Sequence, residues 1–69
     1  MSILMSPPMQ QPTAADYLSS VGHMEPQAAA SMLKTATVMG RIHVPGHRVT
    51  VTAQPHGGDF VYRVAQSIG

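Results

Sequence analysis

The chain carries only four basic side chains, and three of them are arginines. Lys34 comes first, and Arg41, Arg48 and Arg63 follow it, with His43 beside the first arginine. A guanidinium group binds a phosphate or a carboxylate through two parallel hydrogen bonds. In the strand register that the predicted hairpins set, the three arginines and His43 fall on one face of a sheet. This pattern predicts a basic face for an anionic partner. The alternative is that these residues are simply the polar side of a half-buried sheet.

Four histidines raise the question of a metal site. His43, His47 and His56 are the closest together in the sequence, and His23 lies further off. The predicted register places His43 and His47 on opposite sheet faces, so one ion could bind both only across a bulge. The chain has no cysteine and only three carboxylates. We therefore predict no metal and no cofactor, with the histidines on turns and on the surface, where their titration can make binding pH-dependent.

No set of residues has the spacing of a catalytic site. The three carboxylates form no evident pair for acid–base catalysis, and Ser31 has no histidine near it in the sequence. The Gly57-Gly58-Asp59 stretch is not followed by a predicted helix whose N-terminus could bind phosphate, and a turn explains its glycines. The sequence therefore predicts that the protein is not an enzyme.

Length and composition point to one small domain that associates with itself or with a partner. A chain of 69 residues buries about 60% of its unfolded surface, which leaves a single copy marginally stable. The chain has no cysteine for disulfides, so a second subunit is the remaining common means of stabilisation. Only 10% of the residues are charged and the net charge is +1, which favours association. We expect a homodimer.

The first twelve residues contain three prolines and three methionines without a period. We interpret residues 1–12 as a flexible proline- and methionine-rich arm. The arm lacks the positive start and the apolar core of a secretory signal. No apolar run in the chain approaches the roughly 20 residues of a membrane span. We therefore expect a cytoplasmic protein without a membrane partner.

Two helices are predicted after the arm. Thr13 has the spacing of a capping box with Asp16, which predicts a helix over 13–21. Pro26 suits the first turn of a second helix, which is expected to end near 35–38, where threonine and valine lower helix propensity. The apolar positions at helical spacing are Ala14, Tyr17, Leu18 and Val21 in the first helix, and Ala29, Met32, Leu33 and Ala36 in the second.

Three strands are predicted after the helices, and they form an antiparallel meander. With Pro45-Gly46 as a two-residue turn, Ile42 pairs with Val49, and the apolar residues share one face. Pro-Gly prefers a type II turn, so a bulge or a longer loop is the alternative there. The expected strands cover about 38–44, 47–54 and 59–65.

A second turn at 55–58 would pair Val51 with Tyr62 and continue the apolar face. The two helices are then available to cover this face. The sequence thus predicts an α+β fold, with two short helices followed by a three-stranded antiparallel meander. It forms a single domain over 13–66, with a short tail at 67–69.

The order helix, turn, helix, glycine and hairpin resembles the winged helix-turn-helix superfamily over about residues 13–64. An alanine and a leucine on the first helix, three apolar positions on the second, and a Gly-x-Ile step into the wing carry the resemblance. The chain departs from the family because only the arm stands where another helix usually precedes the pair. The turn SSVGHMEP is also about four residues longer than usual. The matching residues are Ala15, Leu18, Ala29, Leu33, Ala36, Gly40 and Ile42.

The resemblance implies a DNA-binding protein whose second helix enters the major groove. Gln27, Ser31 and Lys34 would then face the bases, with Ala30 allowing close approach. The alternative is an ordinary solvated helix face with one lysine. The expected contacts with the phosphate backbone are Arg41, His47 and Arg48.

Two functions of different classes follow from these observations. The first is a small dimeric regulator that binds duplex DNA, of the kind that phages and plasmids encode; the order of elements favours it. The second is a small phage-type inhibitor that binds an acidic host protein or defence complex through the arginine-bearing face. The low charge of the chain favours this second function. A third reading is a structural dimer with no independent activity.

Overall fold

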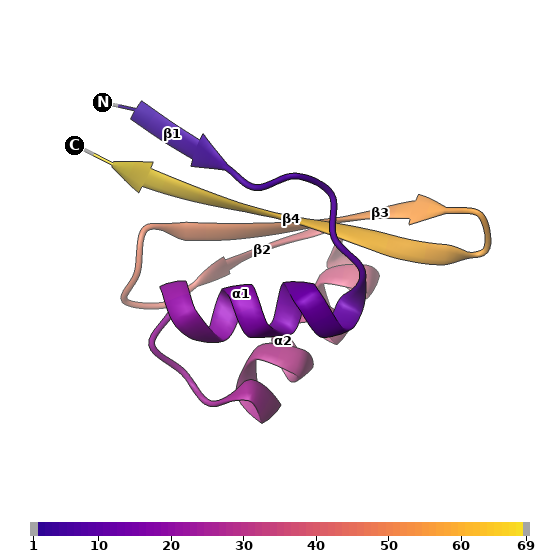
Figure 1. The fold of residues 1–69 in the computed structure, drawn as a ribbon, viewed down its shortest axis with the longest axis horizontal. Coiled ribbons are helices and arrows are strands. Elements are labelled where there is room, and N and C mark those ends of the chain that lie inside the picture. The colour runs from indigo at the N-terminus through magenta and orange to yellow at the C-terminus, as the bar shows by residue number, and fades with distance from the viewer. Residues whose placement is uncertain (1, 69) are drawn as a thin grey trace.

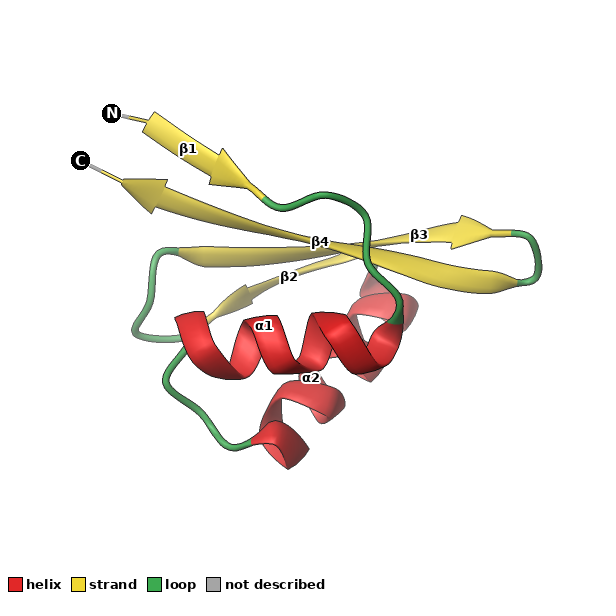
Figure 2. Cartoon of the chain, viewed as in Figure 1, coloured by secondary structure: helices red, strands yellow, loops and turns green. Residues whose placement is uncertain are grey.

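The computed structural model describes residues 2–68 and shows two helices packed on one face of a four-stranded antiparallel sheet (Figure 1, Figure 2). The strand order across the sheet is β1-β4-β3-β2. The α+β class and the two helices were predicted correctly, but the prediction of three strands was wrong by one. The elements are β1 (Ser2–Met5), α1 (Gln11–Val21), α2 (Pro26–Met39), β2 (Arg41–Val44), β3 (Val49–His56) and β4 (Asp59–Ile68).

The additional strand is β1, which lies within the segment that the sequence assigned to an arm. It pairs antiparallel with the end of β4, from Ser2 opposite Ile68 to Met5 opposite Ala65. The pairing extends β4 through most of the predicted tail at 67–69. The last residue of that tail and the first residue of the arm lie outside the described residues.

Contacts with β4 continue beyond the end of β1. The Ser6 N–H donates to the Val64 carbonyl oxygen at 2.9 Å. The buried Ser6 hydroxyl accepts the Val64 N–H, also at 2.9 Å. Met9 and Tyr62 exchange two backbone hydrogen bonds of 2.9 and 2.8 Å. The Ser6 side chain thus supplies the acceptor for the Val64 N–H where the regular ladder stops, and the prolines at 7 and 8, which have no N–H, cannot continue the ladder as donors.

Both predicted hairpin registers were wrong by two residues. Ile42 pairs with Val51, because a four-residue connection over 45–48 joins β2 to β3. The His47 N–H bonds the Val44 carbonyl oxygen at 3.3 Å, and Gly46 has φ +77°, as in the type II turn that Pro-Gly prefers. A shift of two keeps every side chain on its predicted face, because side chains alternate with a period of two.

The second hairpin turns on two glycines and not on the four residues predicted. Gly57 and Gly58 have φ of +58° and +84°, and His56 pairs directly with Asp59. A two-residue type I′ turn needs positive φ at both central positions, which Gly-Gly supplies at little cost. Val51 therefore pairs with Val64, and this long hairpin projects beyond the helices (Figure 1).

The first helix begins earlier than predicted. Gln10 is the N-cap without a side-chain cap, and Thr13 lies exposed inside the helix, so the predicted capping box does not form. Pro26 occupies the first turn of α2 as predicted, but α2 continues to Met39 and includes residue 38, which was assigned to a strand. Gly40 then ends α2 at φ +85°, and its carbonyl oxygen accepts the Ala53 N–H at 3.0 Å. This bond joins the helix end to the sheet.

The core lies between the helical layer and the sheet. Small residues on both helices let the two layers approach closely, and β-branched residues fill the space from the sheet side. The half-buried Tyr17, Val21, Met32 and Phe60 pack against this core. The buried residues are Ala14, Ala15 and Leu18 of α1, Ala29, Leu33 and Ala36 of α2, and Val44, Val49, Val51, Ala53, Tyr62 and Val64 of the sheet.

We predict that Ser6→Ala destabilises the fold by about 1–3 kcal/mol, since it leaves the buried Val64 N–H without an acceptor. Urea denaturation followed by circular dichroism measures this difference. Ser20→Ala, at an exposed position of α1, is the matched control and should change stability little. Equal midpoints for Ser6→Ala and wild type would show that the N-terminal segment does not hold β4 as described.

Candidate functional site

The sheet face turned away from the helices carries the arginines. Thr52 pairs with Arg63 on one side and with Arg41 on the other, so these three side chains form one row across the sheet. At about 4.8 Å per strand spacing, the two arginine Cα atoms are about 10 Å apart. Such a pair with a hydroxyl between them can contact neighbouring anionic groups of one ligand.

A second row runs beside the first on the same face. Thr50 pairs with His43 and with Ala65. Arg48 reaches the same area and, with His43 and Thr50, lines a shallow hollow of about 210 Å³ that also contacts Ile3. The structure therefore brings together four of the predicted site residues. We call this surface the basic sheet face, and its members are Arg41, His43, Arg48, Thr50, Thr52 and Arg63.

Arg63 lacks a strong partner. Its side chain is half-buried, and its Nε is buried without a hydrogen-bond partner in the part of the chain that the structure describes. Its Nη1 contacts only the Met5 sulfur, at 3.7 Å, and a thioether is a weak acceptor. Neither Arg63 nor Arg41 forms an ion pair with a carboxylate among residues 2–68. Both guanidinium groups therefore remain available to an anionic partner.

The predicted helix contacts lie on the other side of the sheet. Gln27, Ser31 and Lys34 are exposed along α2, as predicted, and α2 packs on the sheet face opposite the arginines (Figure 2). Seven of the eight predicted residues are thus divided between two surfaces that face opposite ways. The prediction that the helices cover the apolar sheet face already implied this division, because it left the arginines on the opposite face.

His47 lies on neither of these two surfaces. It lies half-buried in the β2–β3 connection, and its ring centroid is 5.8 Å from that of His23, with a 39° angle between the ring planes. The connection therefore lies against the turn that joins α1 to α2. The four histidines do not converge: the described residues contain no group of three or more metal-binding side chains.

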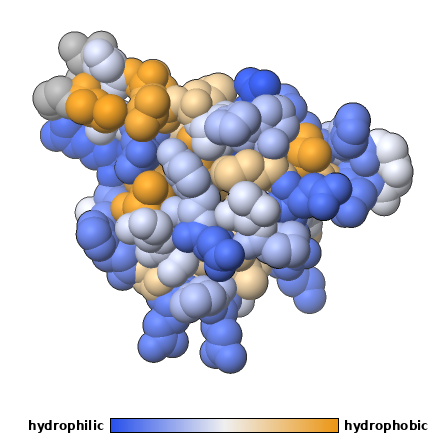
Figure 3. Space-filling view, viewed as in Figure 1, coloured by the Kyte–Doolittle hydropathy of each residue, from blue (hydrophilic) through white to orange (hydrophobic). Residues whose placement is uncertain are grey.

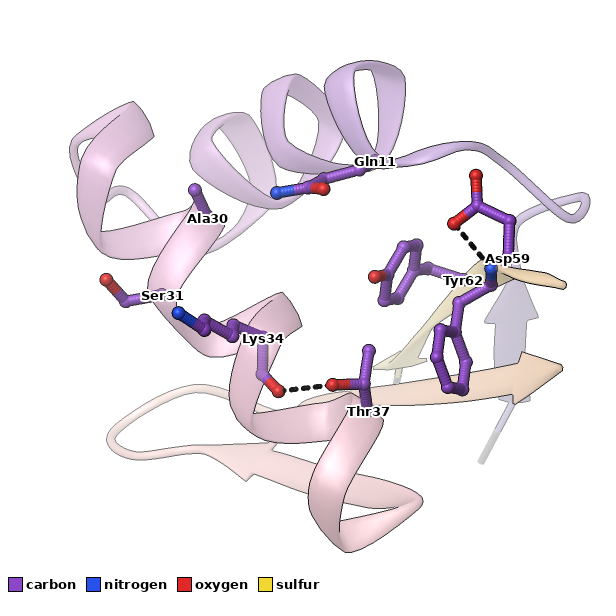
Figure 4. Close-up of a pocket in the computed structure, with 8 residues that line it drawn as sticks. Gln11, Ala30, Ser31, Lys34, Thr37, Asp59 and Tyr62 are labelled. Carbon is purple, nitrogen blue, oxygen red and sulfur yellow. Dashed lines mark hydrogen bonds between the residues drawn. The ribbon is translucent and has the colours of Figure 1, made fainter.

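A groove between α2 and the start of β4 was not foreseen from the sequence. Its volume is about 520 Å³, and Figure 4 shows Lys34 and Ser31 on α2 along one side and the Tyr62 hydroxyl directed toward α2 from the other. Tyr62, which the sequence placed in the core, lines the groove although only 5% of its surface is exposed. A tyrosine on a buried face usually keeps its hydroxyl near a hydrogen-bond partner or solvent, and this requirement was the sequence signal for an opening beside Tyr62. The other lining residues are Gln11, Ala30, Ser31, Lys34, Thr37, Asp59 and Phe60.

The Tyr62 phenol is held in its neutral form. Burial raises its pKa above the ordinary value of 10.0, and the negative charge of Asp59 raises it further. The Asp59 carboxylate is itself fixed at the start of β4, where its Oδ1 accepts the Phe60 N–H at 2.8 Å. At neutral pH the groove thus offers a protonated hydroxyl between an ammonium group on α2 and a carboxylate on β4.

Comparisons with protein-family models, curated proteins and solved structures gave no match to this chain. Within residues 2–68, neither helix is long and apolar enough to span a membrane. The functional argument therefore depends on the surfaces themselves.

We predict that Tyr62 ionises above pH 10 in the folded protein. Its raised pKa stabilises the fold fully below the unfolded value near 10, and this contribution is lost as the pH rises through the folded pKa. Tyrosinate absorbance of wild type minus that of Tyr62→Phe isolates this titration from that of Tyr17. A difference curve with its midpoint at or below 10 would contradict the burial described here.

Proposed function

We propose that the protein is a small regulator that binds duplex DNA, and that the basic sheet face is its main contact with the phosphate backbone. The supporting observation is that all three arginines, together with His43, lie on one face. Two of the three carboxylates in the chain, Asp16 and Glu25, belong to the helical layer on the opposite side. The third, Asp59, begins β4 at the β3–β4 turn. Arginine and hydroxyl side chains are groups that contact phosphate oxygens.

The composition of this face favours a duplex over a single strand. Thr50 and Thr52 place hydroxyls between the basic side chains, where they can donate to phosphate oxygens. Within the described sheet, Phe60 and Tyr62 face the helices. Single-strand binding usually relies on such rings as stacking platforms. The face therefore suits contact with the backbone more than contact with unstacked bases.

The winged helix-turn-helix mode gives a second candidate surface for the same function. The two helices, their turn and the following hairpin occur in the expected order. The contact between His23 and His47 places the hairpin connection beside the turn that precedes α2. In this mode Gln27, Ser31 and Lys34 enter the major groove. One straight duplex cannot contact α2 and the basic sheet face at once, so variants on the two sides distinguish the modes.

An acidic protein is the alternative partner, and one observation favours it. Ile3 and Met5 lie on the same sheet face as Arg48 and Arg63, and they are 69% and 52% exposed. Arginine and methionine beside exposed aliphatic groups are enriched in protein–protein interfaces. An inhibitor of a host protein would use this mixed surface.

We expect binding to a mixed pool of duplex DNA at about 50 mM salt, with a large loss at 200 mM. Replacing Arg41 and Arg63 together by glutamine should weaken binding and reduce the slope of log affinity against log salt by about 0.9 for each lost phosphate contact. Lys34→Gln is the control on the opposite side and should change binding little. Fluorescence anisotropy measures all three proteins.

If Lys34→Gln weakens binding to duplex DNA and the double arginine variant does not, the DNA contact would be assigned to α2. Absence of binding by wild type at 50 mM salt would reject the DNA proposal. Affinity capture with the wild-type protein and with the double arginine variant would then test for an acidic protein partner. Such a partner should bind the wild type and not the variant.

The free edge of β1 supports a dimer through a second copy of the chain. The Ser6 N–H bonds Val64, so the backbone groups of Leu4 also point toward β4, whereas those of Ile3 and Met5 point away from it. Figure 3 shows hydrophobic residues gathered where β1 runs beside the end of β4. No side chain before Asp16 is charged, so two such edges meet without repulsion.

An antiparallel pair of β1 strands centred on Leu4 would satisfy these groups in both copies. Ile3 of one copy then lies opposite Met5 of the other, and the two Leu4 side chains face each other. The two sheets become one, and the basic sheet face is doubled. A doubled set of phosphate contacts gives the affinity that one copy with three arginines lacks.

We predict that Leu4→Cys forms a disulfide-linked dimer on mild oxidation. Facing residues of a non-hydrogen-bonded pair have Cα atoms about 4.5 Å apart, within the range that a disulfide spans. The chain has no other cysteine, so the product is unambiguous. Ile3→Cys is the control, since its two copies would lie about 9 Å apart, beyond the limit of about 7 Å. Equal cross-linking of both variants, or a monomer by light scattering, would exclude this interface.

A further inference from the structure

We propose that the groove between α2 and the start of β4, here called the α2–β4 groove, binds a small organic monoanion. The ligand places its carboxylate between Lys34 and the Tyr62 hydroxyl, and a flat apolar portion against Phe60. This site is separate from the basic sheet face, because it opens on the helical side of the sheet. The inference does not depend on DNA binding.

The Tyr62 hydroxyl is the first observation that points to a ligand. Only 5% of the Tyr62 surface is exposed, and its hydroxyl, which forms no hydrogen bond within residues 2–68, opens onto the groove. Figure 4 shows the hydroxyl end of the ring directed into the groove toward α2. The backbone N–H and carbonyl oxygen of Tyr62 are both bonded to Met9, and Ala53 is its neighbour across the sheet on β3. The hydroxyl is therefore a fixed polar group that a ligand in the groove would satisfy.

Lys34 supplies the charge. It projects from α2 on the wall opposite Tyr62 and forms no ion pair with any carboxylate in the described chain (Figure 4). Gln11, at the start of α1, directs an amide into the same space, and Ser31 adds a hydroxyl one turn before Lys34. The Thr37 hydroxyl is already used, because it donates to the Lys34 carbonyl oxygen at 2.6 Å. Three types of donor thus line one groove from three elements.

The groups in the groove select the class of ligand. A protonated phenol, an ammonium and an amide N–H all donate to a carboxylate oxygen. Asp59 lies at the other end of the groove and opposes a second negative charge, which favours a monoanion over a dianion. Phe60 provides an apolar wall for a flat ring. The volume of about 520 Å³ lies within the range of small-ligand sites.

The test is a titration of the whole chain, labelled with ¹⁵N, against sodium benzoate, sodium acetate and inorganic phosphate, followed by two-dimensional NMR. Benzoate should shift the amide signals of Ser31, Lys34, Phe60 and Tyr62 in a saturable way. Acetate has the same carboxylate without the ring, so it should bind several-fold more weakly. Lys34→Gln and Tyr62→Phe should each weaken benzoate binding at least threefold, and Lys34→Arg should retain most of it.

Arg48→Gln is the matched control, because it removes one positive charge outside the groove and should leave benzoate affinity unchanged. Retained dispersion in the spectrum of Tyr62→Phe establishes that this variant is folded. The proposal is overturned by the absence of saturable benzoate shifts, by equal affinities of wild type and Lys34→Gln, or by shifts confined to the basic sheet face. Saturation by phosphate but not by benzoate would also overturn it, because the ligand class would be wrong.

Discussion

The hydrogen bonding of β4 on both of its edges is the constraint on which the fold depends. One edge pairs with β3 through a tight glycine turn, and the other pairs with the N-terminal segment. Central strands need every backbone group satisfied, which explains why the Ser6 hydroxyl replaces a backbone acceptor beside the prolines. With β4 fixed in this way, the inner residues Tyr62 and Val64 meet the helices, and Arg63 between them must face outward.

The alternation of side chains was predictable from the sequence, whereas the length of each turn was not. Assignment of faces needs only the parity of the pairing, so a register error of two residues left the arginines on the correct side. The turns were harder, because Pro45-Gly46 and Gly57-Gly58 each fit more than one loop length. The Gly-Gly pair was the stronger signal, since it supplies positive φ at both central positions of a type I′ turn. The strand β1 was missed because the prolines that follow it give this segment the composition of a disordered arm.

The candidate site shows a similar division between local and tertiary information. Exposure of Gln27, Ser31 and Lys34 follows from helical periodicity, and the sequence predicted it correctly. Separation of these residues from the arginines depends on the packing of two layers, which the sequence implied only through the predicted cover of the apolar sheet face by the helices. Tyr62 illustrates the same limit: its alternation predicted burial, but the groove beside its hydroxyl arises only where α1, α2 and β4 meet.

The pairing of β1 with β4 also has a consequence for how the chain folds. Both helices and both hairpins form from contacts that are close in the sequence, whereas β1 joins the sheet through partners more than 55 residues away. Closing such a long loop is slow and costs more chain entropy than closing a hairpin. During synthesis, β1 must therefore wait until β4 has left the ribosome, and its apolar side chains remain without their native partner until then. We therefore expect β1 to join the sheet after the hairpins have formed, although it is made before them.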